Sequence, residues 1–274
     1  MRLARPLHND AARSSRSPAQ TLSLYMYTRI ITLILVALVA PPLFAQEQKG
    51  PTLDELVAKN IEAKGGADAL HALQSLKLTG KTLVNQGQIQ FDYSQTKKRP
   101  GEVRTEATLQ GMTLVQAYDG KEGWKISPFQ GRKDPEKMSA DDVKSLIEDS
   151  EIDGPLVDWK TKQSTVDYLG TEDVDGTLAY KLKVVRKNGD VNFVYLDPDH
   201  FLEIRILTQR VEQGAQVEVE TDLGDYEKIN GVFIPFSIEA GRKGDSDKQK
   251  TIIDKAEGNV PVDDAIFHFP APSK

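Results

Sequence analysis

Apolar and polar residues alternate along short segments of this chain, and that alternation limits what it can fold into. From Ser75 onward the pattern has period two, as in residues 180–187, 202–206, 217–220 and 232–238. Successive side chains of a β-strand point to opposite faces, so each such segment has one apolar face and one polar face. The pattern predicts half-buried strands over most of the chain.

Turn signals recur about every ten residues in the same region. Asp-Gly or Asn-Gly dipeptides stand at 119–120, 175–176, 188–189 and 230–231. Tight hairpin turns favour these dipeptides because both central residues need positive φ. We therefore expect about ten to eleven strands between Ser75 and Phe269, joined as one antiparallel meander. A sheet of that width curls or closes on itself.

A helix is predicted before the first strand. Thr52 stands three residues before Glu55, the spacing of a capping box, and apolar residues at helical spacing follow as far as Gly65-Gly66. The two glycines are typical of a helix end. Residues 67–73 could form one or two further turns before the strands begin.

A second helical pattern interrupts the strands at residues 139–163. Ser139 is a capping residue, and Val143, Leu146 and Ile147 form an apolar stripe at helical spacing. Gly154-Pro155 then restarts the chain with proline at a helix-initiating position. We expect two short helices here, the second containing Leu156, Val157 and Trp159.

The first 45 residues have the order of a secretory signal. Arg29 precedes the apolar residues 30–40, whose only polar member is Thr32, and a small residue, Ala45, stands before a polar run. The apolar stretch is shorter than the roughly 20 residues of a membrane span. We therefore expect a signal peptide over 1–45, with translation starting at Met26 as an alternative, and a single domain over 46–274. The expected location is the periplasm.

Charge excludes one class of partner. The leader carries five Arg and one acidic residue, so residues 46–274 have a net charge of −10 against −6 for the whole chain. Nucleic-acid binding needs clustered basic residues, so we expect no nucleic-acid partner. The chain contains no cysteine, which excludes disulfides, thiol nucleophiles and lipidation at a cysteine.

Catalytic and metal-binding patterns are not found in the sequence. His71, His200 and His268 are far apart in sequence and none has a second histidine three or four residues away, whereas zinc needs three or four ligands. No Gly-x-Ser-x-Gly elbow occurs. We expect no catalytic residue, no metal and no cofactor.

The helical insertion has two interpretations. It could plug the apolar face of the curved sheet, or it could cover that face incompletely and leave a pocket for an apolar ligand. The candidate residues for the cavity and its lid are the aromatic residues around the insertion and the apolar residues within it. They are Phe91, Tyr93, Tyr118, Trp124, Phe129, Val143, Leu146, Ile147, Leu156 and Trp159.

The order of these elements resembles a known family. The segments that carry the resemblance are 117–124 (AYDGKEGW), 195–198 (YLDP) with 202–205 (LEIR), and 225–226 leading to 230–235 (NGVFIP). Together they resemble the bacterial outer-membrane lipoprotein-sorting proteins, the carriers of the LolA/LolB-like fold. The resemblance implies an unclosed antiparallel β-barrel with a helical lid over a cavity for acyl chains. Such carriers latch the lid with an arginine, and Arg99 and Arg104 lie on the corresponding stretch.

Three functions are therefore compared. The first is a periplasmic carrier, a monomer, that binds a lipid or an acylated lipoprotein. The second is a sensor or scaffold of the same fold that binds a protein of the inner or outer membrane. The third is an enzyme acting on a lipid or glycan, which would need titratable residues facing the cavity. We expect the first, and hence no enzymatic activity.

Overall fold

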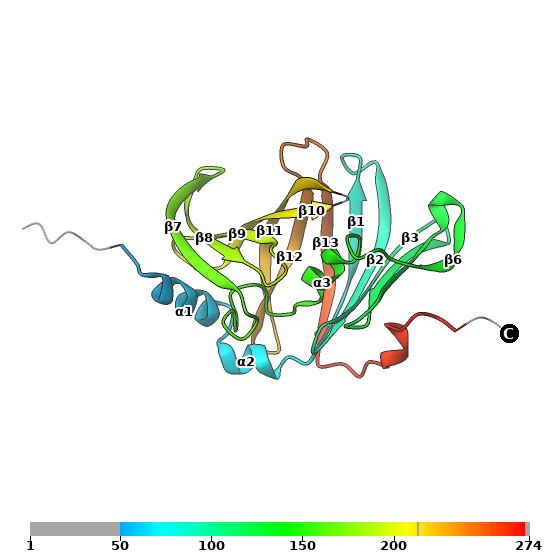
Figure 1. Cartoon of the computed structure of the whole chain (residues 1–274), viewed down its shortest axis with the longest axis horizontal. Helices are drawn as coiled ribbons and strands as arrows, with labels where there is room; N and C mark the ends of the chain where they lie inside the picture. Colours follow the sequence, from blue (N-terminus) through cyan, green and yellow to red (C-terminus); the bar gives the residue numbers. More distant parts are fainter. Residues whose placement is uncertain (1–49, 213, 272–274) are drawn as a thin grey trace, which may run out of the picture. The chain divides into compact units, whose positions relative to one another are not determined.

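The described residues form one antiparallel sheet with helices at one end and across one face (Figure 1). The computed structural model describes residues 50–212 and 214–271, so the predicted signal peptide lies outside the described residues. Among the described residues no helix is long and apolar enough to cross a membrane.

Thirteen strands and a few short helices make up this part of the chain. The helices are α1 Leu53–Ala63, α2 Ala67–Ala72 and α3 Lys144–Ser150, with short 3-10 helices η1 Pro128–Gln130 and η2 Asp264–Ile266. The strands are β1 Ser75–Val84, β2 Ile89–Lys98, β3 Glu102–Leu109, β4 Met112–Tyr118, β5 Gly123–Ser127, β6 Arg132–Lys137, β7 Thr165–Val174, β8 Thr177–Val185, β9 Val191–Leu196, β10 Glu203–Glu212, β11 Ala215–Ile229, β12 Val232–Arg242 and β13 Gln249–Gly258.

The predicted mainly β fold is confirmed, with more strands than expected. In addition to the alternating segments, the sheet contains β6, whose sequence RKDPEK has no apolar–polar alternation and gives no strand signal. Its order is β6-β5-β4-β3-β2-β1-β13-β12-β11-β10-β9-β8-β7, and the edge strands β6 and β7 do not pair. The sheet is therefore an unclosed antiparallel barrel.

The first and last strands pair with each other in the middle of the sheet. From β1 the chain runs outward by hairpins to the edge strand β6, and from the opposite edge strand β7 it returns by hairpins to β13. The connection between the edges, residues 138–164 with α3, crosses one face of the sheet (Figure 1). This connection is called the insertion below.

The N-terminal helix begins at the predicted capping box. The Thr52 amide donates to Glu55 Oε2 at 2.8 Å, and the Glu55 amide donates to Thr52 Oγ1 at 3.3 Å. Leu56 and Val57 on α1 are buried against β7–β9, while Leu70 on α2 is buried against β1 and β12. The predicted short helix at residues 67–73 is therefore present.

The insertion contains one α-helix, and the prediction of a second helix at 154–163 is wrong. Residues 157–163 form turns, because Asp158 adopts φ +52° and interrupts the helical path. Leu156 and Val157 are nevertheless fully buried, so these residues anchor the insertion to the core without being helical.

The sheet has different partners on its two faces. Cross-strand partners lie on the same face, and Lys77, Thr96, Arg104, Ala117 and Trp124 form one row of partners across β1–β5. This row alternates with Leu76 and Leu78, which face the insertion, so Trp124 lies on the opposite face. There the Trp124 indole N–H donates to the Phe267 carbonyl at 2.7 Å, and the C-terminal segment covers the ring.

Phe267 is expected to stabilise the fold from the face opposite the insertion. Its side chain is fully buried, so Phe267→Ala should lower the free energy of unfolding by about 3 to 5 kcal/mol. Phe269→Ala is the matched control, because Phe269 is half exposed and only its edge-to-face contact with Trp124, worth about 1 kcal/mol, would be lost. Urea denaturation of the two variants measures the difference. Equal losses would mean that the C-terminal segment does not seal this face.

Candidate functional site

A cavity of about 400 Å³ lies between the insertion and the face of the sheet that it crosses. That size falls in the range of small-molecule binding pockets. One side of the cavity is formed by strands from both halves of the sheet, and the other side by α3 and the segment after it. The insertion therefore does not plug the sheet completely.

The floor of the cavity is apolar. Alternation places every second side chain of β1, β10, β11 and β12 on this face. The apolar residues that this alternation places in the lining are Leu76, Leu78, Ile206, Val219, Leu223, Ile234, Ile238 and Ala240, and Tyr226, Phe233 and Pro235 also border the cavity. Covering such a surface with hydrocarbon removes it from water, which is energetically favourable.

The opposite wall is charged, and Glu148 on α3 is its first anchor to the sheet. Glu148 Oε1 accepts hydrogen bonds from Asn192 Nδ2 at 2.7 Å and from Thr208 Oγ1 at 3.0 Å. Arg210 on β10 lies 3.4 Å from Glu148 Oε2. The first residues of this wall are thus held to β9 and β10 by polar contacts.

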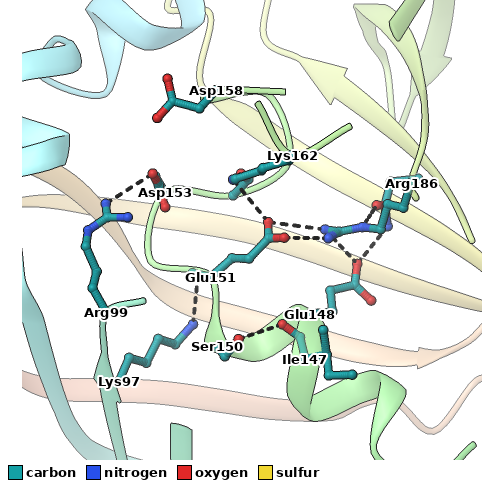
Figure 2. A network of polar contacts seen from close by, with 12 residues as sticks. Lys97, Arg99, Ile147, Glu148, Ser150, Glu151, Asp153, Asp158, Lys162 and Arg186 are labelled. Carbon is teal, nitrogen blue, oxygen red and sulfur yellow. Dashed lines mark hydrogen bonds and ion pairs between the residues drawn. The ribbon is translucent and has the colours of Figure 1, made fainter. Parts of the chain in front are cut away.

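Glu151 is the second anchor, as Figure 2 shows. Arg186 of the β8–β9 hairpin donates to Glu151 Oε1 at 2.7 Å, and Lys162 Nζ lies 3.4 Å from Glu151 Oε2. The side chains of Arg186 and Glu151 are 14% and 20% exposed, so water reaches this pair. Such partly exposed ion pairs typically contribute about 0.2 to 1 kcal/mol each.

A buried ion pair joins the end of α1 to the cavity. Lys64 Nζ contacts Glu203 Oε1 at 2.8 Å, with side chains only 10% and 3% exposed, and it also donates to the Asp153 carbonyl at 3.0 Å. The Tyr226 hydroxyl donates to the Glu203 carbonyl at 2.7 Å, and burial raises the pKa of that hydroxyl well above its ordinary value. Lys64 thus connects α1, the insertion and β10.

Arg99, the residue after β2, contacts the insertion, whereas Arg104 does not. Arg99 lies 3.1 Å from Asp153 Oδ2 and also donates to the carbonyls of Leu70 and Leu73 (Figure 2). Arg104, on the opposite face, pairs with Glu106 and donates to the Ile266 carbonyl. Of the two arginines that the resemblance singled out, only Arg99 contacts the insertion.

Lys97 and Asp149 line the cavity and make fewer contacts. Lys97 Nζ reaches only the Glu151 carbonyl, at 3.5 Å, and the Asp149 carboxylate has no hydrogen bond or ion pair within the described residues. Burial raises the pKa of Asp149, an effect that the nearby Lys97 ammonium opposes, and burial lowers the pKa of Lys97. Asp149 is nevertheless an exposed side chain and Lys97 a half-buried one, so water reaches both.

A second cavity of about 320 Å³ lies on the other side of the insertion. Its lining includes Arg99, Ser150 and Lys162, and it shares Glu151 and Ile152 with the larger cavity. The segment from Glu148 to Gly154 therefore borders both hollows.

None of the ten residues predicted from the sequence is in the lining of the larger cavity, and Trp124 lies on the opposite face of the sheet. Tyr118 and Ile147 line the second cavity, and Phe91 and Phe129 pair edge to face with centroids 5.6 Å apart. The other six are in packed positions: Leu146, Leu156 and Trp124 are buried, Val143 packs on Gly123, Tyr93 adjoins the core of β1 and β12, and Trp159 adjoins the core of α1 and β7–β9. Their part in ligand binding stays a prediction.

The lining residues that sequence reasoning missed are of two kinds. The apolar ones on β10–β12 belong to segments whose alternation was recognised, but alternation does not tell which face is hollow. The charged ones, such as Glu148 and Glu151, belong to an acidic run that is typical of a solvated turn. Nothing in the sequence therefore distinguishes them from ordinary surface residues.

One cluster of the described residues could offer three ligands to a metal. His71, Asp153 and Asp158 bring ligand atoms within 4.8 Å of one another, and His71 Nε2 lies 2.7 Å from Asp158 Oδ2. Asp153 is already paired with the Arg99 guanidinium, a cation that opposes a metal ion at the same carboxylate. The cluster is better suited to fixing α2 against the insertion.

Solved structures share this fold. An outer membrane lipoprotein-sorting protein domain from Vibrio parahaemolyticus aligns over 76% of this chain and 93% of its own, with a TM-score of 0.52 and 10% identity. A LolA superfamily protein from Nitrosomonas europaea aligns over 80% and 98%, with a TM-score of 0.54 and 13% identity. The chain has the fold of these proteins.

A third structure extends the same result to another group of proteins. A DUF1329 family protein from Desulfovibrio piger aligns over 78% of this chain and 96% of its own, with a TM-score of 0.54 and 12% identity. Identities this low show the fold alone, and the predicted LolA/LolB-like fold is thereby confirmed. No protein-family model matches the chain, and no curated protein matches its sequence.

Removing one partner of the buried ion pair is expected to destabilise the protein strongly. Lys64→Met leaves Glu203 buried without a counter-charge and should lower the free energy of unfolding by about 3 to 5 kcal/mol. The double variant Lys64→Met/Glu203→Leu removes both charges and should recover much of that loss. Urea denaturation compares the two. A double variant no more stable than the single one would show that the pair is not the main interaction of Lys64.

Proposed function

We propose that this protein is a periplasmic carrier that binds the acyl chain of a lipid or lipoprotein between the sheet and the insertion. The observation that supports this most directly is the cavity, which has an apolar floor and a wall held by polar contacts. Burial of one CH₂ group contributes about 0.8 kcal/mol. Exposing an acyl chain of about sixteen carbons to water therefore costs on the order of 12 kcal/mol relative to burying it. A carrier that covers such a chain removes this barrier to crossing an aqueous compartment.

Release of the ligand has a structural basis in the same contacts. The anchors of the insertion at Glu148 and Glu151 are partly exposed ion pairs and hydrogen bonds, which water can replace at small cost. The apolar side of α3, with Leu146 buried on β3 and β4, stays packed. We propose that the segment from Glu148 to Gly154 moves while the rest of the insertion remains attached.

We further propose that the protein acts in the periplasm as a monomer and without catalysis. The similarity in fold to a lipoprotein-sorting domain and a LolA superfamily protein supports a role in lipid or lipoprotein binding. The leader-like order of residues 1–45 supports export. We propose binding without catalysis by a monomer, since most charged groups of the cavity wall neutralise one another.

Filling the cavity should abolish ligand binding. Ala240 lies on β12 and lines the cavity, so Ala240→Trp places a large ring where the acyl chain would lie. The dissociation constant for N-phenylnaphthylamine, whose fluorescence rises in an apolar site, should increase at least about tenfold, a change equivalent to about 1.4 kcal/mol. The control is Ala215→Trp, at an exposed position of β11.

The two outcomes separate the proposed function from its alternatives. The carrier predicts that lipid co-purifies with the natural protein and not with Ala240→Trp, as measured by extraction and mass spectrometry. If the natural protein binds neither the probe nor any lipid, the cavity has no carrier function. A sensor or scaffold, recognised by pull-down of a membrane protein, would then be the better account of the fold.

A further inference from the structure

Three neighbouring connections of the sheet are free of charged residues. The connections β1–β2, β3–β4 and β5–β6 leave the sheet at the same end, because neighbouring strands are antiparallel. They lie within residues 84–91, 107–118 and 126–131, which contain no Asp, Glu, Lys or Arg, although 28% of the chain is charged. These three connections are called the uncharged tips below.

Each uncharged tip exposes one large apolar side chain. Ile89, Met112 and Phe129 are each 39% exposed. The chain on either side is charged: the connection 243–248 beside the end of β1 has four charged residues, and the third tip is followed by the basic residues 132–133. Exposed apolar side chains scattered singly need no explanation, whereas a group of them on one surface marks an interaction site.

The first two tips lie on the face of the sheet that carries the cavity. Gln95 on β2 lines the cavity, so alternation places Phe91 and Ile89 on the same face of that strand. On β3 the same face holds Leu109, whose partner on β4 is Met112. The apolar side chains of two hairpins therefore point to one side.

Phe129 joins this surface from η1, which contacts β4. Its ring meets the Phe91 ring edge to face, with centroids 5.6 Å apart. The apolar patch is defined as Ile89, Phe91, Leu109, Met112 and Phe129. Along β2, the same face of the strand leads from this patch to the cavity lining.

We propose that the apolar patch docks on the surface of a lipid bilayer. Binding to a membrane interface grows with the apolar area that enters the acyl boundary, and a charged residue at that depth is costly. The uncharged tips meet both conditions. The route along β2 would then let an acyl chain pass between the bilayer and the cavity. This transfer rests on the proposed function, whereas docking does not.

A protein partner fits the apolar patch less well than a bilayer. Stable protein–protein interfaces bury about 800 Å² on each side and involve about 20 to 30 residues a side. The patch offers three exposed apolar side chains, each from a different connection, and a second copy of the chain would meet the same small area. A bilayer needs no complementary shape, so three separate anchors suffice.

Vesicle binding by a patch variant tests the proposal. The natural protein should sediment with phosphatidylcholine vesicles. The patch variant Ile89→Ser/Met112→Ser/Phe129→Ser should bind at least about tenfold more weakly, a change equivalent to about 1.4 kcal/mol. All proteins are expressed from the full chain, so that they share one N-terminus, and urea denaturation of each verifies that it is folded.

The matched control removes apolar side chains that are more exposed but lie elsewhere. Leu169, Leu178 and Val211 are 51%, 59% and 49% exposed on β7, β8 and β10. Their triple substitution to serine should leave vesicle binding unchanged. An equal loss in both triple variants would mean that general surface hydrophobicity causes the binding, and the docking proposal would be overturned.

Salt separates apolar docking from charge attraction. Raising the ionic strength from about 0.1 M to about 1 M shortens the Debye length from about 10 Å to about 3 Å. Because the tips carry no charge, vesicle binding should not weaken. Binding that disappears at high salt would contradict docking through the apolar patch.

The remaining outcomes distinguish docking from the carrier proposal. If the natural protein binds N-phenylnaphthylamine and lipid but does not bind vesicles, only the docking proposal fails. If it binds vesicles through the patch but binds neither the probe nor any lipid, only the carrier proposal fails. A membrane protein that binds the natural protein and not the patch variant, in the absence of vesicle binding, would assign the patch to a protein partner instead.

Discussion

The rest of the structure depends on one topological constraint, which is that the chain leaves the sheet at one edge and re-enters it at the other. Because β1 and β13 pair in the middle, the two halves of the meander grow outward in opposite directions and end at β6 and β7. The 27 residues from 138 to 164 must then span the width of a curved sheet (Figure 1). A segment that short crosses the face as a strap with one short helix, and it cannot cover the whole face.

The chemistry of the insertion follows from this crossing. Its ends are fixed by apolar packing, at Leu146 on one side and at Leu156 and Val157 on the other. The residues between them pass over the hollow and are held to the sheet by ion pairs and hydrogen bonds. Partial burial makes each of these contacts specific in geometry and modest in free energy.

The local structure was predictable from the sequence where it depends on nearby residues. The alternation of β8 and β12 and the capping box of Thr52 are local signals, and each produced the expected element. The pairing of β1 with β13 is a contact between the two ends of the domain and leaves no local pattern. For the same reason, the sequence did not reveal that Trp124 lies under the C-terminal segment, opposite the cavity.

The candidate site shows why charge was the harder signal to interpret. An acidic run such as residues 148–153 is usually solvated, and only the tertiary fold brings Arg186, Arg210 and Arg99 to it. Once these are placed, Glu148, Glu151 and Asp153 each have a counter-charge. A wall made only of apolar residues would have no polar contacts that water could replace when the wall moves. A wall held by partly exposed ion pairs and hydrogen bonds can be opened by water at small cost.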